Sequence, residues 1–338
     1  MNVYTLENTN GLRMRVSEIG GAVMELRVPD RSGMFADIVL GYDSVEPYRT
    51  GKAYLGALIG RYGNRIANGA FSINGSRYEL ATNNGANHLH GGVQGFNRAV
   101  WKVDPISGEG FSGLVLTHRS HDGEEGYPGN LDVQVTYKLT DANEWVIEYE
   151  ARTDEPTFVN LTQHTYFNLA GHDSGEILDQ EIQLNADSIT PVAAGLIPTG
   201  EIVPVAGTPF DFRTSKPIGR DIGIDDAQIA QGQGYDHNFV LKKQGAAGAL
   251  EQAALARDPS SGRTLETFTT EPGVQFYSGN CLTGSEIGKG GVSYARRNGF
   301  CLETQHFPNS PNQPQFPSTL LRPGESYRSS TVYRFGVD

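Results

Sequence analysis

The chain has 338 residues, of which 38% are hydrophobic and 20% are charged, a composition typical of a globular protein rather than a disordered or membrane-embedded one. The formal net charge is −12 and no run of Lys or Arg could follow a phosphate backbone, which argues against a nucleic-acid partner. The N-terminal segment lacks the apolar core of a signal peptide, and no stretch approaches the ~18 apolar residues of a membrane span, so we expect a cytoplasmic protein without a membrane partner.

Alternation of apolar and polar residues recurs along the chain and predicts strands. The clearest pair, 131–139 and 145–150, is joined by a short polar turn and predicts an antiparallel hairpin with one side facing solvent. Further strands are expected at 12–18, 23–28, 37–41, 77–81, 113–119, 158–167, 274–278, 299–306 and 327–336. Helical periodicity is confined to 225–231 and 248–257.

Glycine and proline, 42 and 17 residues, are scattered along the chain and could supply many tight turns. There is no internal repeat and no Ser/Gly-rich linker. We therefore predict one domain over residues 1–338, an all-β fold built as a large antiparallel β-sandwich with few short helices. A concave polar face of such a sheet would bind a hydrophilic ligand.

The predicted strand 158–167 carries short polar side chains where ordinary strands carry Lys, Asp or Glu. Its even positions are Phe158, Asn160, Thr162, His164 and Tyr166, and its odd positions are mostly apolar. Hydrogen-bonding groups held on a rigid strand suit recognition of sugar hydroxyls, although a merely polar outer face is the alternative interpretation.

The segment 299–317 contains the second unusual strand. Alternation places Cys301, Glu303 and Gln305 on one face, and Glu303 is flanked by apolar residues, which predicts partial desolvation and raised basicity. Four prolines then stiffen the loop that follows the strand. The alternative for Glu303 is an ordinary surface carboxylate.

Two glycine-flanked segments carry further polar residues. Asn64 and Arg65 lie in 60–69, and His88 and His90 lie in 87–96. The two histidines, at a spacing of two, would share a strand face and could form a metal site with Glu303 or with a further histidine. No third ligand lies at a recognisable spacing, so a metal site is the weaker interpretation.

Three other residues complete the set of candidates. Asp236 stands beside a histidine in the turn-like segment 234–239, and a glycosidase could use it as the second carboxylate with Glu303. The two cysteines, Cys281 and Cys301, have no metal-type spacing and are expected to be buried free thiols of a reducing compartment, with a disulfide as the alternative.

Six motifs of the chain, in order over residues 60–317, resemble those of the aldose 1-epimerases, also called galactose mutarotases. They are GRYGNRIANGAF, NHLHGGVQGF, VNLTQHTYFNLAG, YDHNF, GVQFYSGN and GFCLETQHFPNSPNQP. The resemblance implies a β-sandwich of the galactose mutarotase type. It also implies an isomerase that interconverts the α and β anomers of free aldohexoses, such as D-galactose and D-glucose, without a metal or cofactor.

The resemblance assigns roles to matching positions. Glu303 is implied to be the general base and His164 the general acid. The implied substrate-binding residues are His90, Arg65, Asn64, Asp236 and Gln275. Two departures from the commoner motif are Gly63, where Ala is expected, and Asn309, where Asp is frequent. The rival functions are an epimerase of hexose 6-phosphates and a noncatalytic sugar-binding module, and the sequence predicts nothing about oligomeric state.

Overall fold

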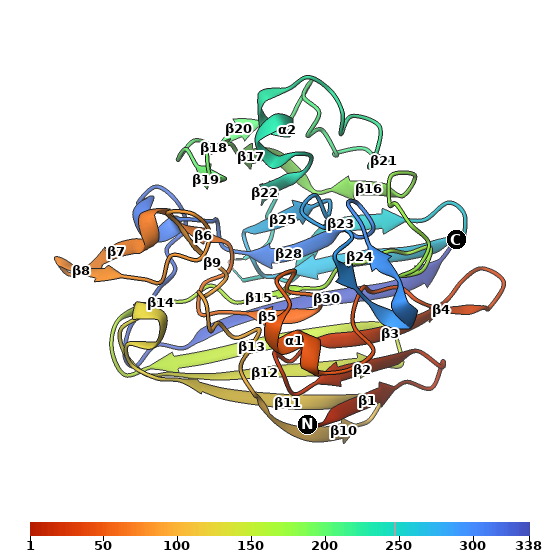
Figure 1. Ribbon diagram of the computed structural model, residues 1–338, viewed down its shortest axis with the longest axis horizontal. Coiled ribbons are helices and arrows are strands. Elements are labelled where there is room, and N and C mark those ends of the chain that lie inside the picture. Colours follow the sequence, from red (N-terminus) through yellow and green to blue (C-terminus); the bar gives the residue numbers. More distant parts are fainter. Residues whose placement is uncertain (247) are drawn as a thin grey trace.

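Antiparallel sheets dominate the computed structural model, which describes residues 1–246 and 248–338 (Figure 1). The largest sheet has nine strands in the order β10 (Lys102–Gly108), β11 (Phe111–Ser120), β12 (Leu131–Thr140), β13 (Glu144–Thr153), β30 (Tyr327–Val337), β24 (Arg263–Thr269), β23 (Glu251–Arg257), β16 (Glu181–Leu184) and β21 (Lys216–Pro217). A second sheet has five strands in the order β20 (Val203–Pro204), β17 (Ala186–Thr190), β22 (Asp236–Leu241), β25 (Gly273–Tyr277) and β28 (Cys301–Gln305).

Smaller elements complete the fold. A four-stranded sheet contains β1 (Val3–Glu7), β2 (Arg13–Ser17), β3 (Val23–Pro29) and β4 (Phe35–Asp37). The two-stranded pairs are β5 (Ala57–Ile59) with β15 (Thr162–His164), β6 (Arg65–Ile66) with β9 (His88–Leu89), β7 (Ala70–Ile73) with β8 (Ser76–Glu79), β14 (Thr157–Phe158) with β29 (Leu320–Leu321), β18 (Val192–Ala193) with β19 (Ile197–Pro198), and β26 (Glu286–Ile287) with β27 (Ser293–Tyr294). Within residues 1–246 and 248–338, the helices are α1 (Glu46–Thr50), α2 (Ala227–Gly232) and four 3₁₀ turns, η1 (Ala67–Gly69), η2 (Glu124–Gly126), η3 (Lys289–Gly291) and η4 (Ser310–Asn312).

The hydrophobic core lies between the nine-stranded and five-stranded sheets. In β12, Val133 and Val135 are buried while Gln134 is exposed, as a strand with one covered face requires. Buried side chains of both sheets belong to the same cluster, and the Tyr333 hydroxyl on β30 donates to the Leu302 carbonyl on β28 at 2.8 Å. The two layers therefore form a sandwich, and the fold class predicted from the sequence is confirmed.

Most of the predicted elements are present. The hairpin expected from 131–139 and 145–150 is β12 paired antiparallel with β13. The helix expected at 225–231 is α2, which begins after Asp226, whose carboxylate accepts hydrogen bonds from the N–H groups of Gln228 and Ile229. Among the described residues, no helix is long and apolar enough to cross a membrane. The single-domain organisation stays a prediction.

Two predicted elements are wrong. The segment 248–257 is not a helix, because residues 251–257 form β23 between β16 and β24. Its Ala- and Leu-rich sequence favours a helix, but pairing on both sides inside a sheet overrides that propensity. The strand expected at 37–41 ends at Asp37, after which Val39 makes only an isolated bridge to Phe167.

The segment 158–167 is not one continuous strand. Only 157–158 and 162–164 are strands, as β14 and β15, and every residue from 157 to 169 is buried. The alternative interpretation of this segment, a merely polar outer face, is therefore wrong. The polar side chains of the segment lie inside the molecule, where they need hydrogen-bond partners.

Candidate active site

A cavity of about 370 Å³ opens where segments distant in the sequence meet. Glu303 comes from β28, His164 from the end of β15, Arg65 from β6, and Asp236 from the start of β22. The lining comprises Lys52, Ala53, Tyr54, Asn64, Arg65, Asn84, Leu89, His90, His164, Tyr166, Asp236, Tyr277, Cys281, Leu282, Thr283, Ser285, Glu286 and Glu303. Six of the seven predicted site residues line this cavity; the seventh, Gln275, lies behind it.

Glu303 is a buried carboxylate in the middle of β28, with 2% of its surface exposed. Its Oε2 has no hydrogen-bond partner among the described residues. Burial raises the pKa of Glu303 well above the ordinary carboxyl value, and the nearby Asp236 charge raises it further, while Arg65 opposes both effects. The desolvation predicted from its apolar sequence neighbours is thus present.

His164 lies next to Glu303 in the wall of the cavity. Its Nε2 lies 3.7 Å from Glu303 Oε1, too far for a direct hydrogen bond. On the other side of the ring, Nδ1 lies 3.5 Å from the Cys301 sulfur, and the ring of Tyr54 stacks on the imidazole with centroids 5.7 Å apart. Burial lowers the pKa of His164 to about 4, because the charged imidazolium loses its hydration.

His90 is held by the backbone of the neighbouring segment. The Asn64 N–H donates to His90 Nδ1 at 3.1 Å, and the His90 N–H donates to the Asn64 carbonyl at 3.0 Å. Because Nδ1 accepts, the proton of neutral His90 resides on Nε2, where it can be donated to a ligand. Burial lowers the pKa of His90 well below the ordinary value, so the neutral form is favoured. A Cβ on the next residue, Gly91, would lie 1.7 Å from the Gly60 carbonyl oxygen, so only glycine fits there.

Gln275, Asp236 and Arg65 each make a side-chain hydrogen bond at the site. Gln275, opposite Glu303 in the register of β25 and β28, donates through Nε2 to Asp236 Oδ1 at 2.7 Å. Burial raises the pKa of Asp236, and this effect outweighs the charge of Arg65 and the hydrogen bond from Gln275, both of which lower it. Arg65 Nε donates to Asn84 Oδ1 at 3.0 Å. Gln275 therefore acts on the cavity through Asp236, and Asp236 begins a strand rather than lying in the expected turn.

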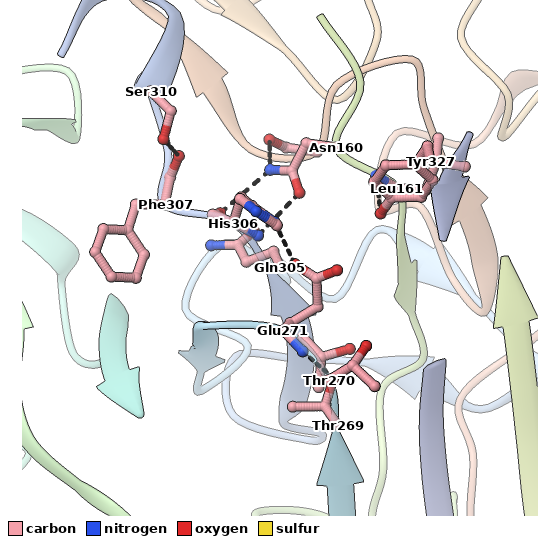
Figure 2. A network of polar contacts seen from close by, with 12 residues as sticks. Asn160, Leu161, Thr269, Thr270, Glu271, Gln305, His306, Phe307, Ser310 and Tyr327 are labelled. Atoms are coloured by element: carbon pink, nitrogen blue, oxygen red, sulfur yellow. Dashed lines mark hydrogen bonds and ion pairs between the residues drawn. The ribbon is translucent and has the colours of Figure 1, made fainter. Parts of the chain in front are cut away.

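Asn160 joins three segments that carry site residues, as Figure 2 shows for its contacts with His306. Its Oδ1 accepts from the His306 N–H at 3.0 Å, and its Nδ2 donates to the His306 carbonyl at 3.2 Å. Its backbone N–H donates to the Arg61 carbonyl at 3.0 Å, and its carbonyl accepts from the Gly63 N–H at 2.7 Å. Asn160 thus ties together the chain before β6, before β15 and after β28, and it does not line the cavity.

The donor atoms of His90, His164 and Glu303 lie within 4.8 Å of one another and are the one group of described residues that could hold a metal ion. Ligand atoms on a single tetrahedral zinc lie about 3.3 Å apart, so the three side chains would have to draw together. His88 does not belong to this group. Its Nδ1 lies 2.7 Å from the Ala81 carbonyl and its Nε2 lies 2.8 Å from the Tyr127 hydroxyl, which directs it into the core.

The expectation of two buried thiols is half wrong. Cys301 is fully buried, but Cys281 is exposed and lies at the edge of the cavity. Other lining residues have no recognisable signal in the sequence: Lys52 and Tyr54 come from a loop, and Glu286 comes from the two-residue strand β26, which is too short to show alternation. The sequence does not predict the contact between Cys301 and His164. It predicts only that Cys301 and Glu303 share one face of their strand.

Comparison with known proteins identifies the family. A family model described as aldose 1-epimerase matches residues 2–334. The galactose mutarotase of Bos taurus is 46% identical over 328 residues, which cover 96% of this chain and 92% of that protein. The aldose 1-epimerase of Escherichia coli K12 is 39% identical over 335 residues, which cover 98% and 94%. The chain belongs to the aldose 1-epimerase family.

Solved structures agree with this assignment. A C. elegans aldose epimerase homologue superposes with a TM-score of 0.90 at 29% identity and covers 99% of both chains. A galactose 1-epimerase from Lactobacillus acidophilus gives 0.86 at 30% identity, covering 98% of this chain and 93% of that one. The resemblance seen in the six motifs is confirmed, and the chain is an enzyme of the isomerase class. The glycosidase alternative, which would pair Glu303 with Asp236, is not supported by any of these relatives.

Proposed function

We propose that the protein interconverts the α and β anomers of free aldohexoses, such as D-galactose and D-glucose, in the cytoplasm and without a metal or cofactor. Family membership supports the reaction type. The observation that carries the mechanism is the placement of Glu303 and His164, 3.7 Å apart, on the wall of one cavity. A carboxylate and an imidazole at this separation can reach two neighbouring oxygen atoms of one sugar ring.

Anomer exchange requires the ring to open and to close on the other face. Glu303 takes the proton from the C1 hydroxyl while His164 gives a proton to the ring oxygen, the C1–O5 bond breaks, and an aldehyde forms. The C1–C2 bond then rotates. On closure, the O5 hydroxyl attacks the aldehyde, His164 recovers its proton and Glu303 returns the other, so the enzyme ends each cycle unchanged.

The two pKa shifts strengthen both groups for these roles. A raised pKa makes the Glu303 carboxylate a stronger base, and a lowered pKa makes the His164 imidazolium a stronger acid. Before a sugar binds, the same shifts favour a protonated Glu303 beside a neutral His164. The pair then holds one proton in total, which is also the number in the productive ion pair, so binding of the sugar needs only to move that proton.

The other candidate residues are proposed to bind sugar hydroxyls. Asp236 accepts hydrogen bonds, Arg65 donates them, and His90 donates through Nε2, with Asn64 beside them. Gln275 orients Asp236 through their 2.7 Å hydrogen bond. This mixture of donors and acceptors matches the hydroxyl groups of a sugar, each of which can both donate and accept.

Polarimetry tests the proposal. Freshly dissolved α-D-glucose and α-D-galactose should relax to their ordinary final rotation faster with the protein than without it, and EDTA should leave the acceleration unchanged. No acceleration with either sugar would contradict the proposal. Acceleration that disappears with EDTA would instead favour a metal held by His90, His164 and Glu303.

An epimerase of hexose 6-phosphates is the weaker candidate. Arg65 and Lys52 are the basic residues that line the cavity in the described part of the chain, but Asp236, Glu286 and Glu303 line it as well. Convergent cations, which a phosphate group needs, are therefore offset by carboxylates. Faster mutarotation of glucose 6-phosphate than of glucose would reverse this preference.

A further inference from the structure

The side of the His164 imidazole that faces away from Glu303 has an unusual partner. In many enzymes the second nitrogen of a catalytic histidine contacts a carboxylate or a backbone carbonyl, which fixes one tautomer. Here His164 Nδ1 lies 3.5 Å from the sulfur of Cys301. Cys301 has no exposed surface, and burial keeps its thiol protonated by raising its pKa well above the ordinary value.

Resting on the proposed function, we propose that Cys301 is a positioning residue for His164, whose thiol contacts Nδ1 in both protonation states of the imidazole. His164 gives and recovers its proton through Nε2, which faces the cavity, so the neutral ring keeps its proton on Nδ1 and the sulfur accepts from Nδ1–H. Toward the imidazolium, the sulfur can likewise accept from Nδ1–H. One side chain therefore supports both states through which His164 passes in each turnover.

The strand geometry fixes this contact. Cys301 and Glu303 are two residues apart on β28, so their side chains share one face, and both reach the same imidazole, one at each nitrogen. Backbone pairing with Tyr277 on β25 holds Cys301 in register. The ring of His164 is thus held between two side chains of a single strand.

The chemistry of sulfur explains why a thiol suits this position. A carboxylate at Nδ1 would stabilise the imidazolium and make it a weaker acid toward the ring oxygen. A thiol is a weak acceptor, so it orients the ring with little stabilisation of the charge. The groups that face His164 from all elements packed against it are Tyr54, His90, Tyr166, Tyr277, Cys301 and Glu303. Glu303 is the one carboxylate among them.

Three variants test the proposal: Cys301→Ser, which keeps a group able to donate and accept; Cys301→Ala, which removes it; and Cys301→Asp, which places a carboxylate at Nδ1. We expect Cys301→Ser to retain kcat within a few-fold and Cys301→Ala to lose about tenfold, the lower end of the loss seen when the residue that orients a metal-bound histidine is removed. Cys301→Asp should raise the pKa of His164 by about one unit or more. Equal kcat values and identical pH profiles for Cys301→Ala, Cys301→Ser and the unchanged protein would overturn the proposal.

Titration of the His164 ring by NMR in the sugar-free protein separates this inference from the proposed function. If the contact is real, the ring pKa differs between Cys301→Ala and Cys301→Ser, whether or not the protein accelerates mutarotation. If the ring titrates identically in both variants, the contact has no influence on His164 and the inference fails, even where the sugar assay succeeds. Should Cys301→Asp not fold, this Ala–Ser comparison decides the matter alone.

Discussion

At the scale of single residues, burial shifts Glu303 and His164 in opposite directions, so that the carboxyl group holds its proton more tightly than the imidazole does. This order has a consequence for the pH dependence of catalysis. An acid–base pair with pKa values near those of the free side chains would have its acid limb set by Glu303 and its alkaline limb set by His164. The structure reverses these assignments.

We predict a pH profile of kcat in which the active species is the pair with one proton. As pH falls through the pKa of His164, about 4, a second proton enters and no base remains. As pH rises through the raised pKa of Glu303, the last proton leaves and no acid remains. Polarimetry corrected for spontaneous mutarotation measures the two limbs, and NMR assigns them. An imidazole of His164 that titrates near ~6.5, like the free side chain, would contradict the assignment.

Replacement of Glu303 by Gln should lower kcat by about 10²-fold or more, because the amide cannot accept the hydroxyl proton. The exposed Glu109, in the turn after β10, provides the matched control, and Glu109→Gln should leave kcat unchanged. The comparison requires both variants to unfold at similar denaturant concentrations. A Glu303→Gln variant with nearly unchanged kcat would remove Glu303 from the role of base.

At the scale of elements, Asn160 shows how separate segments keep the site in register. Asn160→Ala removes both side-chain hydrogen bonds to His306 and leaves a part-buried N–H and carbonyl without these partners, which we expect to cost about 1 kcal/mol per group. It should also lower kcat, because the two lost hydrogen bonds connect the chain before β15, which carries His164, to the end of β28, which carries Glu303. Urea unfolding and kcat are the two measurements.

The control for Asn160 is Asn2, which is exposed and donates to Glu18 at 3.0 Å. We expect Asn2→Ala to change the free energy of unfolding by less than about 0.5 kcal/mol and to leave kcat unchanged. If Asn160→Ala lowers stability but leaves kcat at the level of Asn2→Ala, Asn160 supports the fold without positioning the site.

Elements with local patterns could be predicted from the sequence, whereas contacts between elements could not. The β12–β13 hairpin follows from alternation and a turn, and the burial of Glu303 follows from its apolar neighbours. The segment 248–257 has a helical composition, and only its place between two strands makes it β23. His88 and His90 were expected to share a strand face. However, β9 ends at Leu89 and His90 has a φ of 51°, so the alternation that would place both rings on one face is interrupted.

At the scale of the whole molecule, the ion pair between buried Glu271 and part-buried His306 connects the end of β28 to the turn before β25 (Figure 2). Their closest atoms lie 2.5 Å apart. Burial alone would raise the pKa of Glu271 and lower that of His306, but their mutual attraction outweighs it, so the pKa of Glu271 is lowered and that of His306 is raised. Both shifts link the pair to stability.

The sign of the linkage defines a pH window. Glu271 contributes to the free energy of unfolding above the unfolded carboxyl pKa of ~4.5, and this contribution is lost as pH falls through its lowered folded pKa. The contribution of His306 is complete below the unfolded imidazole pKa of ~6.5 and is lost as pH rises through its raised folded pKa. We therefore predict that Glu271→Gln lowers the free energy of unfolding more at pH ~5.5 than at pH ~9.

The control is Asp104→Asn, which breaks an exposed pair with Lys102 at 2.9 Å and should change stability little at either pH. Urea unfolding at both pH values gives the comparison. Equal destabilisation by Glu271→Gln at the two pH values would show that the pair contributes through packing and not through its charges.

The position of β30 in the nine-stranded sheet has a consequence for folding. This strand comes after every other strand in the chain, yet it lies between β13 and β24 and pairs with both. On the ribosome, the strands on either side of it are made first and have no direct pairing with each other. The large sheet therefore cannot be completed until β30 emerges, and we expect one edge each of β13 and β24 to stay unpaired until late in synthesis.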